Sequence, residues 1–521
     1  MLCLERDYSD VLELEAIGKT QDALNLIGEK KLPPEVLTQI AGEFYKSNSV
    51  IALVIAREIL KKGLNHWLLH VINYHLSGLD LMPSQEEAAK SLNWLSRYFK
   101  KISSEKRKEY SDLLRPRLAQ EVYNGYLQNK IPLINHLLEL SKVLMPNELA
   151  AFNNTRSTTS WNLTEIKETS NRRSPISFSG LKMNPSKLPR KAIIASRKYY
   201  YFHDGSRLSD IGPRILSCLK NNGWEAELYL TGPPDINHVV EKNYSDIHNL
   251  CIQMCPDLLI LEEIYVGENR NPTPLEFIRK LRADFPHIRI LSTYLDGWQT
   301  ALWPEMRGAV GFLDGIWCPL PSLSLFQETI FSNKVLFFPL PNFSPHKWDD
   351  SFACNQIAFC GGLAEVNWHR GLWIAALLKA GVHLHVDISK HKPDGLSPEA
   401  SFRMYIKKIQ SFIPNINFAS RYDGSKIHTG RSFEVPLAGA LLIQESNPEI
   451  EHYFTPGEHF LPFTHLDDLI EITDFLRQNP KDVETIRRCG YGFAEKNYGD
   501  AAIASYLNFW LESQNCDVLK T

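Results

Sequence analysis

The feature that most constrains the fold is an alternation of short apolar runs with helical segments, which begins near residue 190. Runs such as KAIIAS (191–196), LLIL (258–261) and VHLHVD (382–387) are bounded by loops and followed or preceded by helix-like stretches. Near-continuous apolar strands are typical of parallel sheets that are covered on both faces. The series stops near residue 345 and starts again, which predicts an α/β fold with two tandem Rossmann-like domains at 189–345 and 346–498. A final helix is expected at 499–521.

The two predicted domains also locate a site. In open parallel sheets, ligands bind outside the carboxyl ends of the strands. Two such domains that face each other place this site between them.

The region before residue 150 has a different, all-helical pattern. Its segment PPEVLTQIAGEFYKSN (33–48) carries apolar residues at helical spacing, and two prolines mark its start. Alanine-centred helices recur at Ala23, Ala52 and Ala89, which loosely resembles tetratricopeptide-type helical hairpins. An irregular helical bundle explains the pattern equally well. Residues 151–188 are rich in Ser, Thr and Asn, and we interpret them as a linker or an extended strap.

Composition narrows the class of protein. The net charge of −3 among 521 residues argues against bulk binding of nucleic acid. Runs of about 18 apolar residues are absent, so we expect no transmembrane segment. The acidic start MLCLERDYSDVLELE lacks the features of a signal peptide, and the nine cysteines follow no disulfide framework. These observations predict a cytoplasmic protein.

The stretch RSFEVPLAGALLIQE (431–445) places a carboxylate at the head of a short helix that runs directly into a strand. Together with the segment that follows it to residue 499, this stretch resembles the C-terminal half of GT-B glycosyltransferases of the CgeB-like, glycosyltransferase-family-1 type. The segment FCGGLAEVNWHRG (359–371) resembles the strand, glycine loop and helix that begin the nucleotide-binding half of that family. The resemblance covers roughly residues 190–515 and does not reach the helical region.

The resemblance implies a role for Glu434. In the family, the glutamate at this helix start accepts hydrogen bonds from the two ribose hydroxyls of a nucleotide-sugar, and a carboxylate has two oxygens for such a diol. The alternative is that Glu434 only compensates the helix dipole. Retaining relatives carry a second glutamate eight residues earlier, where this chain has Lys426. A cation there would contact the diphosphate, and retention or inversion of stereochemistry stays open.

The donor's diphosphate requires cations or N–H donors. The family's glycine corresponds to Gly361. Relatives have an arginine at the position of Gly362 and a lysine at the position of Arg370, so one of the two cations is kept. Arg370 at a helix start and Arg431 are candidates for phosphate binding, with exposed surface arginines as the alternative. Tyr422 is a candidate for stacking on the base, or else a core tyrosine.

The sequence contains no D-x-D pair, so we expect no metal and no cofactor other than the nucleotide-sugar, which is the donor substrate. A general base would come from the acceptor-side domain, where Asp296, His203 and Asp204 follow predicted strands. Asp296 is the favoured base. The alternative for Asp296 is a structural cap by an aspartate before glycine. The alternative for His203 is a structural histidine.

These patterns predict a glycosyltransferase with an N-terminal helical domain that binds a protein acceptor. A glycan or lipid-linked acceptor is the alternative within the enzyme class. A catalytically inactive GT-B-like scaffold for protein interaction is the alternative outside it, because the missing glutamate and arginine would suit a decayed donor site. The sequence identifies neither the sugar, the base, the acceptor nor the oligomeric state.

Overall fold

The structure is a computed structural model with two compact units. One unit comprises Met1–Thr155 and Leu363–Gly381, and the other comprises Arg156–Gly362 and Val382–Thr521. The structure describes residues 85–103, 161–170, 175–177, 190–198, 208–231, 237–262, 275–295, 303–344, 356–361, 369–387, 396–420 and 426–518, with isolated positions at 38, 41, 55, 56, 60, 140, 300, 346, 348 and 354.

The larger unit contains two parallel sheets. The first sheet has six strands in the order β2-β1-β3-β4-β5-β6. Its strands are β1 (Lys191–Arg197), β2 (Glu225–Thr231), β3 (Leu258–Glu262), β4 (Arg289–Thr293), β5 (Gly315–Trp317) and β6 (Val335–Leu336). All neighbours pair in parallel, with Ile194 of β1 opposite Leu228 of β2 and Ile260 of β3. We call residues 190–344, which form this sheet and its helices, the first half.

Helices cover both faces of the first sheet, as continuous apolar strands require. One face packs against α12 (Asn237–Met254), α13 (Leu275–Asp284) and α14 (Trp303–Ala309), which contribute Ile247, Phe277 and Met306 to the core. The other face packs against α11 (Ile211–Asn221). The helix α11 ends before Gly223, whose φ of +84° suits the predicted glycine stop.

The second sheet has five strands in the order β11-β10-β9-β7-β8. Its strands are β7 (Ile357–Cys360), β8 (Leu384–Asp387), β9 (Pro414–Asn417), β10 (Leu441–Glu445) and β11 (Leu461–Phe463), all paired in parallel. Its helices include α16 (Pro398–Gln410), α17 (Arg431–Leu437), α18 (Leu466–Gln478) and α19 (Pro480–Tyr498). We call residues 356–361 and 382–498 the second half. Helix α15 (His369–Lys379), which follows β7 in the chain, belongs to the other unit.

Both sheets have the same topology. Numbered within its own half, each sheet runs 2-1-3-4-5, and the first adds a sixth strand at its edge. This is one of the two common orders of doubly wound α/β folds, and its ligand site lies between the first and third strands, where the winding reverses. The prediction of two tandem Rossmann-like domains is therefore confirmed, and the expected ligand positions are the carboxyl ends of β1 and β3 and of β7 and β9.

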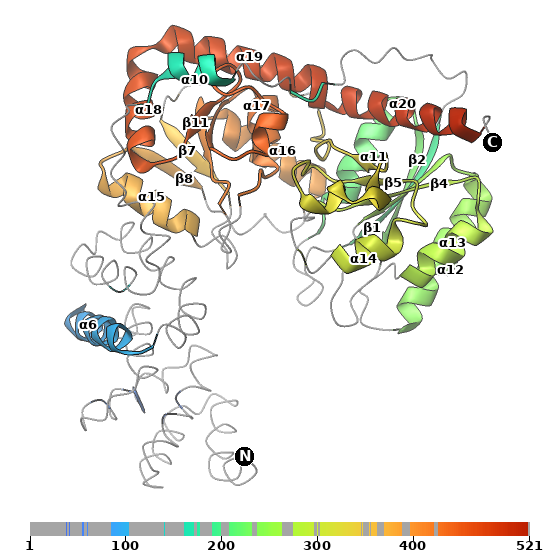
Figure 1. Ribbon diagram of the computed structural model, residues 1–521, viewed down its shortest axis with the longest axis horizontal. Coiled ribbons are helices and arrows are strands. Elements are labelled where there is room, and N and C mark those ends of the chain that lie inside the picture. Colours follow the sequence, from blue (N-terminus) through green and yellow to red (C-terminus); the bar gives the residue numbers. More distant parts are fainter. Residues whose placement is uncertain are drawn as a thin grey trace. The chain divides into compact units, whose positions relative to one another are not determined.

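The C-terminal helix links the halves. Helix α20 (Asp500–Val518) continues from α19 and crosses to the six-stranded sheet (Figure 1). There Ile503, Leu507 and Trp510 complete the core on the α11 side of the first sheet. Burying each of these side chains contributes about 1.5–3 kcal/mol, so the first half depends on the chain end for one of its covered faces.

Residues before the first sheet lie along the second half. Helix α10 (Leu163–Ser170) is followed by Ile176, whose N–H donates to the carbonyl of His452 at 2.7 Å. Trp161 donates its indole N–H to the carbonyl of Pro462 at 2.9 Å, and Ser177 donates to Asn497 at 2.6 Å. This part of the region that we interpreted as a linker or strap is attached along its length to the second half.

The helical region before residue 150 is largely outside the described residues. Helix α6 (Gln85–Lys101) is described and buries Leu92, Leu95 and Phe99 on one face. The repeat-like pattern lies outside the described residues except in this helix. A search of the described helices finds none that is long and apolar enough to cross a membrane.

Candidate functional site

The carboxyl ends of β7 and β9 are bridged by one side chain, Arg431. Its Nη1 donates to the carbonyl of Cys360 at 2.7 Å, and its Nε donates to Asn417 Oδ1 at 3.1 Å. Cys360 ends β7 and Asn417 ends β9, so the guanidinium lies at the point where the winding of the second sheet reverses. Arg431 is buried and also stacks on Phe359, 5.1 Å from the ring centroid.

The glycine that follows β7 is required by this arginine. A Cβ at Gly361 would lie 1.5 Å from Nη1 of Arg431, so a side chain at Gly361 would displace the guanidinium. The structure thus brings together two residues predicted for the donor site, Gly361 and Arg431. The close approach of backbone to guanidinium explains the glycine in local terms, whether or not a ligand is bound.

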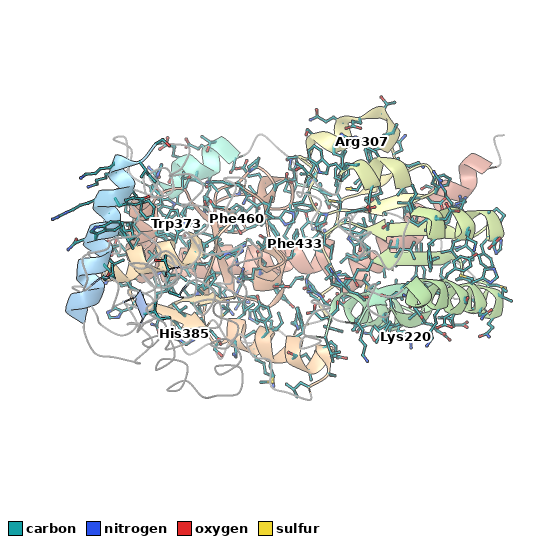
Figure 2. The ribbon with its side chains drawn as sticks, turned by 90° about the horizontal axis from the view of Figure 1, so that it is seen from below. Lys220, Arg307, Trp373, His385, Phe433 and Phe460 are labelled. Carbon is teal, nitrogen blue, oxygen red and sulfur yellow. The ribbon has the colours of Figure 1, made fainter. Side chains whose placement is uncertain are left out.

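Helix α17 follows from the same local sequence. It begins at Arg431, is fully buried, and ends at Leu437 before Gly439, whose φ is +77°. Gly439 therefore adopts the left-handed conformation of a helix-ending glycine, and its N–H donates to the carbonyl of Pro436. This backbone conformation is a sufficient reason for a glycine at position 439. Phe433 of α17 packs edge-on against Tyr453 and Tyr498 (Figure 2).

Glu434 lies one turn into α17 with both carboxylate oxygens engaged. Tyr405 of α16 donates its hydroxyl to Oε2 at 3.0 Å. Arg214 of α11 approaches Oε1 at 3.4 Å with both Nη1 and Nη2. About a tenth of the Glu434 side chain remains exposed. Gly430 leaves room for this carboxylate, because a Cβ there would lie 2.9 Å from Oε1.

The surroundings of Tyr405 keep its hydroxyl protonated. Burial raises the pKa of Tyr405 well above its usual value, and the neighbouring charge of Glu434 raises it further. Tyr405 therefore stays a phenol at neutral pH and acts as a donor to Glu434. The guanidinium of Arg214 balances the carboxylate from the first half.

Lys426, which we predicted to contact the diphosphate, pairs with a carboxylate of the second half. Its ammonium lies 3.2 Å from Oε1 of Glu445 and 3.3 Å from the carbonyl of Ser446. Glu445 ends β10, is buried, and also accepts hydrogen bonds from the backbone N–H groups of Ala419 and Ser420 at 2.8 Å. Lys426 thus neutralises a buried carboxylate of the second half, which is a structural use of its charge.

The winding of the first sheet reverses at a second buried arginine. Arg197 ends β1 and donates its Nε at 2.6 Å to Glu262, which ends β3. Glu262 also accepts the hydroxyl of Ser196 and the backbone N–H of Arg197. Burial raises the pKa of Glu262, and Arg197 opposes this shift. The sequence analysis did not single out this pair, although Glu262 was visible as a carboxylate at the end of a predicted strand.

The remaining predicted site residues are not placed by the structure. Asp296, His203, Asp204, Tyr422 and Gly362 lie outside the described residues. Arg370 is described, is buried near the start of α15, and belongs to the smaller unit. Among the residues that the structure describes, no group of three or more His, Cys, Asp or Glu side chains is arranged to hold a metal ion.

Comparison with known protein families gives one match. Residues 376–507 match a family described as glycosyl transferase-like. The matched segment includes α16, α17 and the strands β8 to β11, and therefore Tyr405, Arg431 and Glu434. The resemblance to glycosyltransferases is thus confirmed for residues 376–507.

Solved structures with a similar arrangement include two complexes with UDP-glucose. One is an alpha-glucosyltransferase in complex with UDP-glucose and DNA containing an abasic site (13% identity, 64% of this chain, 99% of that chain, TM-score 0.41). Another is the Anabaena protein Alr3699/HepE in complex with UDP-glucose (9% identity, 62% of this chain, 99% of that chain, TM-score 0.43). No curated protein sequence matches the chain significantly.

Proposed function

Since residues 376–507 form a glycosyl transferase-like domain, we propose that the chain transfers a sugar from a nucleotide-sugar donor to an acceptor. The observation that carries the proposal is the carboxylate of Glu434. It is partly exposed, it lies one turn after the arginine that bridges β7 and β9, and each of its oxygens retains acceptor capacity. This position and chemistry suit a ribose diol.

The donor's diphosphate would be bound by protein cations. Arg431 lies at the carboxyl ends of β7 and β9, the edge at which ligands bind in such sheets. Arg370 is the second candidate, from the matching position of the family motif. The general base of the transfer is expected in the first half, with Asp296 favoured over His203 and Asp204.

The acceptor is proposed to be a protein that binds through the helical region at 1–150. This part of the proposal rests on the domain organisation. A glycan or lipid-linked acceptor is the alternative.

A panel of nucleotide-sugars tests the donor assignment. We expect one of them to raise the melting temperature of the full chain, because a ligand at 100 times its dissociation constant stabilises the folded state by about 2.7 kcal/mol. The same compound should be consumed, with release of free sugar or transfer to an added acceptor. If no nucleotide-sugar changes the melting temperature, the chain is a non-catalytic scaffold and the proposal is wrong.

Donor binding is also expected to survive removal of divalent metals. The sequence has no D-x-D pair, and arginines would supply the positive charge that a metal supplies elsewhere. The dissociation constant of the nucleotide-sugar, measured by calorimetry with and without EDTA, should agree within about twofold. Loss of binding in EDTA that Mn²⁺ or Mg²⁺ restores would contradict this assignment of the phosphate site.

A further inference from the structure

We propose that Arg214 is a positioning residue for the donor-binding carboxylate. It holds Glu434 so that one lone pair of each carboxylate oxygen faces the ribose hydroxyls, and Tyr405 holds the opposite oxygen in the same way. The inference rests on the proposed function of Glu434 as the ribose ligand. It adds a specificity-determining residue from the half of the molecule that the donor motifs do not include.

The contacts of Arg214 show how it is held. Its Nε donates to the carbonyl of Pro341, and its Nη2 donates to Asn342 Oδ1. Its guanidinium carbon lies 4.5 Å from the ring centroid of Phe402 in α16. The side chain is 8% exposed, so it is confined to one position by the end of the first half and by Phe402 of the second half.

The contact with Glu434 is weaker than these anchors. The distances from Nη1 and Nη2 to Oε1 are both 3.4 Å, longer than the 2.7–2.9 Å or so of a charge-assisted hydrogen bond. Arg214 therefore orients and neutralises the carboxylate without saturating it. This is the behaviour expected of a group that prepares a ligand site.

Counting acceptor positions supports the same conclusion. An ionised carboxylate has about four lone-pair positions, two on each oxygen. Arg214 uses Oε1 and Tyr405 uses Oε2, at 3.0 Å. One position then remains on each oxygen, and a vicinal diol presents two hydroxyl donors. A glutamate that accepts from two donors on different oxygens thus has as many acceptor positions left as a ribose diol has hydroxyl donors.

Arginine is required because its planar, forked guanidinium donates to three partners from one rigid group. A lysine ammonium is a point charge and cannot bond Pro341, Asn342 and Glu434 from one rigid group. Among the described residues, the other titratable groups that face Arg214 include Asp500 and His346. Burial lowers the pKa of His346 to about 4, so His346 is neutral at the pH of the experiment below.

The experiment compares ribose with deoxyribose. Calorimetry on the full chain at pH 7.5 would measure dissociation constants for UDP and for its 2′-deoxy and 3′-deoxy analogues, with the ADP and GDP series in parallel. In the parent, loss of either hydroxyl should weaken binding by about tenfold or more. We call the ratio of the dissociation constants of the deoxy and ribose nucleotides the penalty. In Arg214→Lys this penalty should fall to within about threefold, and it should also fall in Tyr405→Phe. Arg403→Lys, an exposed arginine of α16 paired with Glu399, is the matched control and should keep the parent's penalty.

The parent protein tests whether Glu434 binds the ribose, and the variants test whether Arg214 positions Glu434. If the parent binds no nucleoside diphosphate, or binds ribose and deoxyribose forms equally, Glu434 is no ribose ligand and the proposed function of this site is wrong. If the parent discriminates and both Arg214→Lys and Tyr405→Phe discriminate as strongly, the positioning role is wrong. If Arg214 had a purely structural role, Arg214→Lys would weaken the binding of all nucleotides by the same factor and leave the penalty unchanged. Tyr405→Phe keeps the test valid where Arg214→Lys fails to fold.

Discussion

Replacing Glu434 with glutamine is expected to weaken nucleotide-sugar binding by about tenfold to a hundredfold. Glutamine keeps one acceptor oxygen and replaces the other with an amide NH₂, so a ribose hydroxyl that donates to this position loses its partner. A hydrogen bond to a charged group contributes about 1.5–3 kcal/mol, which corresponds to this loss of affinity. Calorimetric titration with the nucleotide-sugar identified in the panel measures the effect.

The same substitution has a structural consequence that needs a control. Arg214 lies 3.4 Å from Oε1 and would lose the charge that balances it, so some loss of stability is expected. Glu449→Gln is a matched control, because Glu449 is also a buried carboxylate of the second half and accepts the backbone N–H of Ser322 at 3.3 Å. It should keep the parent's affinity. Unchanged affinity in a folded Glu434→Gln protein would mean that Glu434 does not bind the ribose.

The sheets could be predicted from the sequence because their signal is local. Parallel strands buried on both faces are short apolar runs, and β1, β3 and β8 begin and end close to the runs that predicted them. The shorter elements were less visible. Strand β11 (Leu461–Phe463) was not predicted, and β9 (Pro414–Asn417) begins two residues before the apolar run INFAS (416–420) and ends within it. Three or four residues carry too little periodicity to be recognised.

Helix α16 was missed although its start carries clear signals. Ser397 caps the helix by accepting the N–H of Ala400, Pro398 occupies its first turn, and Glu399 follows. This helix supplies Tyr405 and Phe402 to the candidate site. Recognising the capping pattern would have brought a tyrosine into the list of candidates.

Arg214 could not be found from the sequence at all. It is 220 positions from Glu434 and lies in a helix of the other half. Local patterns describe which face a helix buries, but they carry no information about which residues of two domains meet. The same limit applies to Lys426: its charge was visible, whereas its pairing with Glu445 at the end of β10 is a tertiary contact.

Replacing Asp500 with alanine is expected to destabilise the protein by about 2–6 kcal/mol. Asp500 begins α20, and its carboxylate accepts the backbone N–H groups of Asn342 and Ser344, each at 2.9 Å. Its own N–H donates to the hydroxyl of Ser344 at 2.9 Å. Burial raises the pKa of Asp500, and the hydrogen bonds from Asn342 and Ser344, together with Arg214, oppose this shift. Alanine would leave two buried N–H groups without acceptors, at about 1–3 kcal/mol each.

The loss would be transmitted to the first half, because the chain passes from the second half to the first at Asp500. Ile503, Leu507 and Trp510 of α20 cover one face of the six-stranded sheet, and they can pack there only while the start of the helix is held in place. A chemical denaturation curve would show the variant unfolding at a lower midpoint, and an early transition would report separate loss of the first half. Asp482→Ala is the matched control, since Asp482 is an exposed aspartate in the first turn of α19 and should change stability by less than about 0.5 kcal/mol. An Asp500→Ala protein with the parent's midpoint would show that α20 is held by its apolar contacts alone.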